Sequence, residues 1–413
     1  MAFLGSGLAF LIGPGSLLGF TNLLAISRHQ AAHAVTAAWL QAHGHAEVYG
    51  WVGSFILGIG FHSLTRQHNT RISLPRAWTC WALWTAGVAL RWAAAVYTWH
   101  WRALLPVAGG LELAAFLIFF TTVRAAHRRQ PHAAREALPG WIVLVFAGAL
   151  GFLLTVALNA AADVWLARWG AAPVNPPGFD AMLVALMTWA FLVPFVLGFS
   201  TRWFPVFAGL RPAPARASRL LALLVAAGAL ATLARAPTAA ALLWLALALA
   251  AAASLGVARK SLQPAKTQGI HASFPWFLRA AYGWLLVAAA LGVWAALDPA
   301  ATGAGGASRH ALTVGFIAAM VLTIGPRILP AFSGMRKLFS PALMFWALAL
   351  LEAGCLLRVT GELLAYPGWL PFAWRWLPWS AGLEVTAFIV FAYNLVRTLL
   401  RPPEHLRKQQ LAG

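Results

Sequence analysis

Apolar residues follow one another in long runs along the whole chain, and polar residues gather in the short segments between these runs. Each run approaches the ~20 residues that an α-helix needs to cross a hydrocarbon core about 30 Å thick. The runs lack the strict alternation of a half-buried strand, so they predict helices. Twelve membrane-spanning helices are predicted, at residues 5–26, 44–65, 77–98, 103–124, 139–162, 180–201, 217–235, 237–257, 274–296, 307–328, 339–360 and 376–398.

The composition agrees with a chain that lies mostly in lipid. Of the 413 residues, 61% are hydrophobic and 10% are charged, and the mean hydropathy is +0.74. A soluble domain needs far more charge on its surface, so the sequence excludes that class. We predict an all-α integral membrane protein in which residues 1–413 form a single transmembrane domain. The first span follows Met1 without a basic segment or a cleavage site, so it is expected to be retained.

The basic residues predict an orientation. With the N-terminus inside the cell, the inner loops, inner helix ends and C-terminal tail hold most of the 30 Lys and Arg residues. They include Arg66, Arg71, Arg76, Arg124, Arg128, Arg129, Arg211, Arg216, Arg219, Arg259, Lys260, Arg336, Lys337, Arg401 and Lys408. Cytoplasmic loops are enriched in Lys and Arg, so we expect a multi-pass protein of the bacterial cytoplasmic (inner) membrane with both termini in the cytoplasm. The net charge of +20 then reflects topology and contact with the lipid bilayer, and no nucleic-acid partner is expected.

Two motifs that contain ionisable residues occur twice in the same order. HAEVYGWVGSFILGIG begins at His45, and HALTVGFIAAMVLTIG begins at His310, 265 residues later. The next helix of each copy carries AGVALR, which ends at Arg91, or AGCLLR, which ends at Arg358. Two matches at nearly one spacing indicate an internal repeat.

A third motif extends the repeat by one more helix. GLELAAFLIF contains Glu112, and GLEVTAFIVF contains Glu384. A fainter relative lies between the copies, because TRWFPVFAGLR and PRILPAFSGMR share Arg, Pro, Phe, Gly and Arg at identical spacings. The sequence therefore predicts three pseudo-repeated four-helix units, at about 1–130, 135–260 and 270–400, of which the middle one lacks the histidine and the glutamate.

The predicted topology places the repeated ionisable residues in the outer half of the membrane. Each is costly in hydrocarbon, by roughly 2.5–3.5 kcal/mol for a charge at the centre of a helix. We therefore expect these six side chains to face the protein interior and to pair with one another. They are His45, His310, Arg91, Arg358, Glu112 and Glu384.

Haem is the cofactor that this set of residue types favours. Neutral imidazoles of His45 and His310, on two facing helices, can fill both axial positions of the iron. Arginine forks suit the propionate carboxylates. The glutamates could orient imidazole N–H groups or pair with the arginines. Arginines that only make structural pairs with Glu112, Glu384 or Glu352 are the alternative interpretation.

Other histidines near the outer membrane surface have weaker support. His43 lies two residues before His45, about 200° around the helix, so the two cannot face one site. The repeat selects His45, and His43 is a candidate ligand of a second metal such as copper. Glu47 is a candidate for proton transfer or for orienting a ligand. His62 is about 25 Å further along the helix and is expected to be buried or interfacial.

The motifs resemble a known family. HGHAEVYGWVGSFILGIG and SRHALTVGFIAAMVLTIGPRILPAFSG resemble the two histidine-bearing segments of the NnrS family, and STRWFPVFAG is similar to its middle Arg-x-x-Pro segment. This resemblance implies a bacterial membrane protein that holds haem b and possibly copper and is linked to nitric oxide metabolism.

A wider resemblance is to the catalytic subunits of haem–copper oxidases and nitric oxide reductases. It implies twelve helices in three arcs, with His45 and His310 as ligands of a low-spin haem on helices 2 and 10. Ser308 stands where the oxidases have a second histidine, and no histidine occurs between His132 and His271 on the helices that bind copper there. The resemblance therefore implies the scaffold and one haem, but not oxygen reduction.

These observations favour a haem b membrane protein that acts in nitric oxide or nitrosative-stress handling or in associated electron transfer. Whether it is an enzyme stays open at this point. One alternative is a multi-span transporter, because internal repeats and intramembrane charges are also features of transporters. Another is an accessory subunit that docks on a respiratory complex or another redox partner through its apolar exterior.

Overall fold

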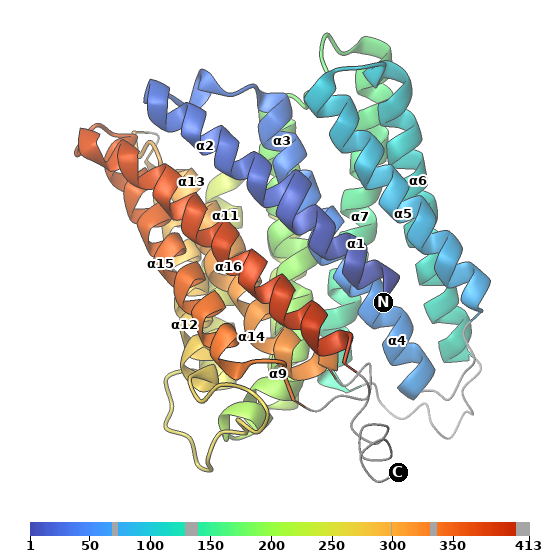
Figure 1. Cartoon of the computed structure of the whole chain (residues 1–413), viewed down its shortest axis with the longest axis vertical. Coiled ribbons are helices and arrows are strands. Elements are labelled where there is room, and N and C mark those ends of the chain that lie inside the picture. The colour runs from blue at the N-terminus through green and yellow to red at the C-terminus, as the bar shows by residue number, and fades with distance from the viewer. Residues whose placement is uncertain (68–72, 129–138, 299, 331–336, 402–413) are drawn as a thin grey trace. The chain divides into compact units, whose positions relative to one another are not determined.

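The computed structural model describes residues 1–67, 73–128, 139–298, 300–330 and 337–401. Within these residues the chain is helical, and its twelve long helices coincide with the twelve predicted spans, which confirms the fold class. The described chain divides into two compact units, Met1–Pro139 with Gly148–Phe191 and Gly140–Ala147 with Leu192–Gly413. Figure 1 shows the elements of both units.

The first unit holds the first five spans, apart from the start of the fifth, and the first part of the sixth. Its elements are α1 (Ala2–Phe10), η1 (Leu11–Leu17), α2 (Leu18–His29), η2 (Ala32–Ala34), α3 (Ala37–His45), η3 (Ala46–Gly53), α4 (Ser54–Gln67), α5 (Leu74–Tyr97), α6 (Trp101–Arg128), most of α7 (Gly140–Trp169), α8 (Pro177–Ala185) and η5 (Leu186–Leu192). Helices α5 and α6 lie side by side as an antiparallel hairpin (Figure 1).

The second unit holds the end of the sixth span and the six spans after it. Its elements are α9 (Val193–Ala208), α10 (Ala215–Leu233), α11 (Pro237–Leu255), α12 (Phe274–Leu297), α13 (Ala304–His310), η6 (Ala311–Ala318), α14 (Ala319–Ile328), α15 (Pro341–Ala365), η8 (Pro371–Arg375) and α16 (Trp376–Leu399). Helices α15 and α16 form the main hairpin of this unit (Figure 1). Among the described residues of both units, ten helices are long and apolar enough to cross a membrane, so the chain is a multi-pass membrane protein.

The two spans outside that group of ten are consecutive. They are the helix over 37–67 and α5, which carry His45 and Arg91. Ionisable side chains in a membrane helix normally face other protein groups, since lipid gives them no partner.

Wide π-helical turns interrupt four of the spans. Each of these segments among the described residues follows directly on an α-helix, and the helices before η3, η5 and η6 end at His45, Ala185 and His310 respectively. η6 begins 265 residues after η3 and 125 residues after η5, which are the offsets of the sequence motifs. π-helical turns are rare and occur frequently at functional sites.

Small residues let the first two spans approach each other closely. A Cβ atom on Gly7 would lie 2.8 Å from the Phe55 ring, and one on Gly50 would lie 2.8 Å from Phe10. Close approach of backbones at small residues is the usual way in which membrane helices associate, because lipid supplies no hydrophobic drive between them. This contact fixes the helix that carries His45.

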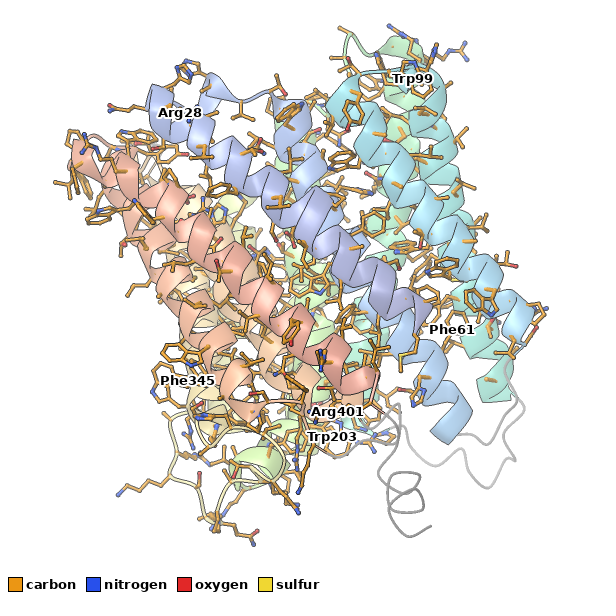
Figure 2. All side chains as sticks on the ribbon, viewed as in Figure 1. Arg28, Phe61, Trp99, Trp203, Phe345 and Arg401 are labelled. Atoms are coloured by element: carbon orange, nitrogen blue, oxygen red, sulfur yellow. The ribbon has the colours of Figure 1, made fainter. Side chains whose placement is uncertain are left out.

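The ends of successive spans alternate, as a membrane topology requires. Figure 2 shows Arg28 and Trp99 at one end of the first unit and Phe61 toward the other end. Within the second unit, Trp203, Phe345 and Arg401 lie together at one end of that unit (Figure 2). Of the basic residues that predicted the orientation, Arg71, Arg129, Arg336 and Lys408 lie outside the described residues, as does the end of the PRILPAFSGMR motif from residue 331.

Gly151 provides a test of packing inside the first unit. A Cβ atom at this position of α7 would overlap the backbone carbonyl oxygen of Ala190, which cannot rotate away. We expect Gly151→Ala to lower the free energy of unfolding by about 1–3 kcal/mol. Gly110→Ala in α6, where no atom lies within 4 Å of the added Cβ, should be neutral or stabilising by up to about 1 kcal/mol. Chemical denaturation in detergent compares the two variants, and equal stabilities would contradict this packing.

Candidate functional site

His45 is the last residue of α3 and directly precedes η3. Thr36 begins this helix, and its hydroxyl oxygen accepts a hydrogen bond from the Trp39 backbone N–H. The His45 side chain is buried, with 5% of its surface exposed. A buried imidazole at the start of a π-helical turn is therefore a fixed group rather than a side chain at the membrane surface.

A buried carboxylate of α6 contacts this imidazole. Nε2 of His45 lies 2.8 Å from Oε1 of Glu112, whose side chain is fully buried. The Tyr49 ring, one turn further along, packs edge-on against the imidazole with 4.8 Å between centroids. Nδ1 of His45 makes no hydrogen bond among the described residues. One ring nitrogen is thus held by a carboxylate, and the other is left for a ligand or a metal.

Gly87 of α5 makes room for Glu112. A Cβ atom on Gly87 would lie 2.7 Å from Cγ of Glu112 and 3.0 Å from the Ala108 carbonyl oxygen. The glycine of AGVALR therefore lies against the glutamate of GLELAAFLIF, which explains why both motifs belong to one hairpin.

Arg91 pairs with Asp163, an acid that sequence reasoning missed. Nη1 of Arg91 donates to Oδ1 of Asp163 on α7, and both side chains are buried. Asn159 lies one turn before Asp163 and is within 3.5 Å of its other oxygen. The available signal was the presence of an acid inside an apolar run, since a charge there requires a partner.

His310 occupies the corresponding place in the second unit. It is the last residue of α13 and directly precedes η6. Its Nδ1 atom lies 2.9 Å from Oε1 of Glu362 on α15 and 3.1 Å from the Gly306 carbonyl oxygen. Its side chain is 29% exposed, whereas Glu362 is buried. The Nε2 atom of His310 makes no hydrogen bond among the described residues.

Glu362 is the second acid that sequence reasoning missed. It lies four residues after Arg358, one helical turn along the same face of α15. A Cβ atom on Gly306 would lie 2.8 Å from Oε2 of Glu362, so the glycine makes room for the carboxylate. Comparison of the two copies could not identify Glu362, because the residue at the equivalent position of the first copy, four residues after Arg91, is Ala95.

Arg358 and Glu384 contact each other inside the second unit. Nη2 of Arg358 lies 3.5 Å from Oε2 of Glu384, and both residues are buried. A Cβ atom on Gly354 would lie 2.8 Å from Cγ of Glu384, which repeats the Gly87–Glu112 contact at the equivalent positions. Nε and Nη1 of Arg358 and Oε1 of Glu384 have no hydrogen-bond partner in the described part of the chain.

The six expected residues thus fall into two groups with different pairings. In the first unit the glutamate contacts the histidine, and the arginine pairs with Asp163. In the second unit the glutamate contacts the arginine, and the histidine contacts Glu362. Both alternatives considered for the glutamates therefore occur, one in each unit.

His43 faces the other side of its helix. Its Nδ1 atom lies 2.9 Å from the Gly15 carbonyl oxygen, and its ring lies where a Cβ atom on Gly19 would be. Glu47, one turn later, accepts a hydrogen bond from the Ser16 hydroxyl. No three His, Cys, Asp or Glu side chains within the described ranges form a cluster that could hold a metal ion, so His43 as a ligand of a second metal such as copper stays a prediction.

Glu352, the alternative acid on α15, has a separate partner. Nε1 of Trp284 on α12 donates to Oε2 of Glu352 over 2.6 Å. This carboxylate has a tryptophan donor in place of an arginine or a histidine, and it offers a comparison for the acids at the histidines.

The histidine nitrogens and arginine N–H groups of the two groups suit the binding of haem. Each histidine has one ring nitrogen at a buried carboxylate and the other without a hydrogen bond, which is the arrangement of metal-binding histidines in general. Arg358 has buried N–H groups that lack an acceptor, as expected of a residue that binds an anionic group. Within each unit the residues present therefore suit a haem, through one imidazole held by a carboxylate, and in the second unit also through an arginine that could bind a propionate.

Comparison with known proteins gives one family and one fold. The sequence model of a family described as NnrS protein matches residues 1–402. A haem–copper terminal oxidase dimer solved by cryo-electron microscopy is similar in fold, with a TM-score of 0.73 and 13% sequence identity, over 97% of this chain and 85% of that one. No curated protein matches the chain. At this identity the oxidase likeness concerns the fold alone.

Proposed function

The chain belongs to the NnrS family, and from that premise we propose that it is a haem b protein of the bacterial cytoplasmic membrane. Its role would be the handling of nitric oxide and nitrosative stress or the electron transfer associated with it. The similarity in fold to a haem–copper terminal oxidase supports the proposal.

His45 and His310 are the proposed axial ligands. One observation carries this assignment: each histidine ends an α-helical segment directly before an eight-residue π-helical turn and has one ring nitrogen at a buried carboxylate. The nitrogen left for iron is Nδ1 in His45 and Nε2 in His310, and either nitrogen serves in metal-binding histidines. Bound haem would supply one-electron redox chemistry.

The remaining repeated residues have distinct proposed roles. Arg358 would bind a propionate through the N–H groups that lack an acceptor, while Glu384 balances its charge. Arg91 already has Asp163 as a counter-ion, so its proposed role is to fix Asp163 and the adjoining helices around Glu112. Glu112 and Glu362 would hold the imidazoles in orientation.

The three pseudo-repeats remain part of the proposal. Their support is the placement of η3, η5 and η6 at the motif offsets, together with the equivalent Gly87–Glu112 and Gly354–Glu384 contacts. In the middle pseudo-repeat, at about 135–260, Ala185 occupies the position that His45 and His310 occupy in the other two. We also propose that both termini lie in the cytoplasm, on the basis of the basic inner segments.

A spectrum of the purified protein tests the function. Protein expressed with haem supplementation is recorded oxidised and after reduction with dithionite, and total iron and copper are measured. We expect a sharp reduced α-band of low-spin haem and about one iron per chain. Protein that is folded and monodisperse but free of haem would contradict the proposal.

Arg358 provides a prediction about the propionate. We expect Arg358→Ala to weaken haem binding by roughly 10–100-fold, because a charge-assisted hydrogen bond contributes about 1.5–3 kcal/mol. Arg358→Lys keeps a charge beside Glu384 but loses the planar fork of the guanidinium. Its haem affinity should therefore lie between those of the wild type and Arg358→Ala. Haem titration of apoprotein measures the three affinities.

The matched control for Arg358 is Arg279→Ala in the same unit. Arg279 donates to the backbone carbonyls of Val257 and Arg259 and is not part of the histidine groups. Its replacement should leave haem affinity unchanged. Equal affinities of wild type and Arg358→Ala would show that this arginine does not bind the cofactor.

A further inference from the structure

A carboxylate contacts the proposed axial imidazole in both units. The nitrogen–oxygen distances are 2.8 Å for His45 and Glu112 and 2.9 Å for His310 and Glu362. Both carboxylates are buried, with 0% and 4% of the side-chain surface exposed. The second oxygen of each, Oε2, has no hydrogen-bond partner among the described residues. The imidazole N–H of His45 is therefore the main hydrogen-bond donor to Glu112, and that of His310 is the main donor to Glu362.

The two contacts are built from residues that do not correspond in the repeat. Glu112 lies on the second helix after its histidine, whereas Glu362 lies on the first. The counterpart of Glu112 is Glu384, which contacts Arg358, and the counterpart of Glu362 is Ala95. Duplication of one ancestral unit would have produced the same pairing twice from equivalent residues. The same histidine–carboxylate contact is instead formed by non-equivalent residues in the two units.

Burial alone does not require an acid to contact a histidine. Glu384 is also buried and has an arginine as its partner, and the partly buried Glu352 accepts from a tryptophan N–H. The three buried glutamates and the partly buried Glu352 thus show three kinds of donor, and the histidine donors occur at the two proposed iron ligands. The shared feature is therefore tied to the iron ligands rather than to burial.

A carboxylate that accepts the N–H of a metal-bound imidazole raises the basicity of that ligand. A more basic imidazole and a nearby negative charge both stabilise Fe(III) relative to Fe(II), since the oxidised iron carries one more positive charge. We infer that Glu112 and Glu362 are positioning residues that hold both axial imidazoles electron-rich and so keep the reduction potential of the haem low. This inference rests on the proposed function, and it predicts a haem that donates electrons readily.

The test is a potentiometric titration of the reduced α-band in the full-length, haem-loaded protein. Glu112→Gln and Glu362→Gln keep the size of the side chain and an acceptor oxygen but remove the charge. Each should raise the midpoint potential so that the ferrous-to-ferric ratio at a fixed potential increases about tenfold, a shift of about 59 mV for one electron. The double variant should shift further. Glu352→Gln, the same change on α15 beside Trp284, is the matched control and should shift little.

The outcomes separate the inference from the proposed function. Raised potentials in both histidine-linked variants, with an unchanged potential in Glu352→Gln, support it. Variants that retain the α-band but keep the wild-type potential overturn it, while the haem proposal stands. A wild-type protein without haem overturns both. If a Gln variant loses haem, Glu112→Asp or Glu362→Asp, which withdraws the charge by one methylene, replaces it, and an unchanged potential there overturns the inference.

Discussion

Removal of either proposed axial histidine is expected to abolish the low-spin haem spectrum. His45→Ala and His310→Ala each remove one of the two proposed axial ligands of the iron, so the sharp reduced α-band should disappear. Haem affinity should fall by more than the roughly 10–100-fold that loss of a supporting residue costs. The measurement is the dithionite-reduced spectrum with haem content per chain, after purification by size exclusion.

His45→Ala also leaves Glu112 buried without its donor, which costs about 1–3 kcal/mol by itself. His45→Gln and His310→Gln therefore accompany the alanine variants, because an amide N–H can still donate to the carboxylate. His33→Ala, at an exposed position in η2, is the control and should keep the full α-band. An α-band of wild-type height in His45→Gln or His310→Gln, with the fold intact, would exclude that residue as a ligand.

The second large effect is expected at Asp163. Asp163→Ala leaves Arg91 buried without a counter-ion, and breaking a buried ion pair in this way typically costs about 3–5 kcal/mol. The free energy of unfolding in detergent, measured by chemical denaturation, should fall by that amount. The yield of monodisperse protein should fall with it.

The double variant Arg91→Met/Asp163→Ala removes both charges and should recover most of the lost stability, because an apolar pair of similar volume is often neutral. The coupling between the two sites follows from the double-mutant cycle. Asn159→Ala, which removes only a 3.5 Å contact to Asp163, should change stability by less than about 1 kcal/mol. A cost for Asp163→Ala no larger than that for Asn159→Ala would show that the pair is not an essential contact.

The fold could be predicted from the sequence because lipid imposes a simple rule. Each span must satisfy its backbone internally, so an apolar run of sufficient length has to be helical. Even 217–235 and 237–257, which only a short polar stretch separates, are two helices, α10 and α11. The π-helical turns could not be predicted in the same way. In these segments Phe10 packs against Gly50, and Trp284 packs against Gly315. Such contacts between helices cannot be read from hydropathy.

The repeated ionisable residues could be expected from the sequence to pair, but their partners could not. Repetition singled out six ionisable residues, and each of them has an ionisable partner within its own unit. Asp163 and Glu362 occur once and have no counterpart, so an argument from repetition could not find them. Side-chain partners depend on distances of a few tenths of an ångström between helices, whereas motif spacing fixes only the level along each helix.

The π-helical turns after the two histidines have a consequence for how the chain tolerates a change in length. In an α-helix each residue advances the side-chain direction by about 100°, so one inserted or deleted residue rotates everything beyond it. A π-helical turn holds an extra residue per turn and can absorb such a change by converting to or from α-helical geometry. Within η3 and η6 a deletion would therefore be taken up locally, and the histidine before it and the packing after it would keep their helical phase. Length differences between relatives should accumulate at these two segments rather than elsewhere in the two spans.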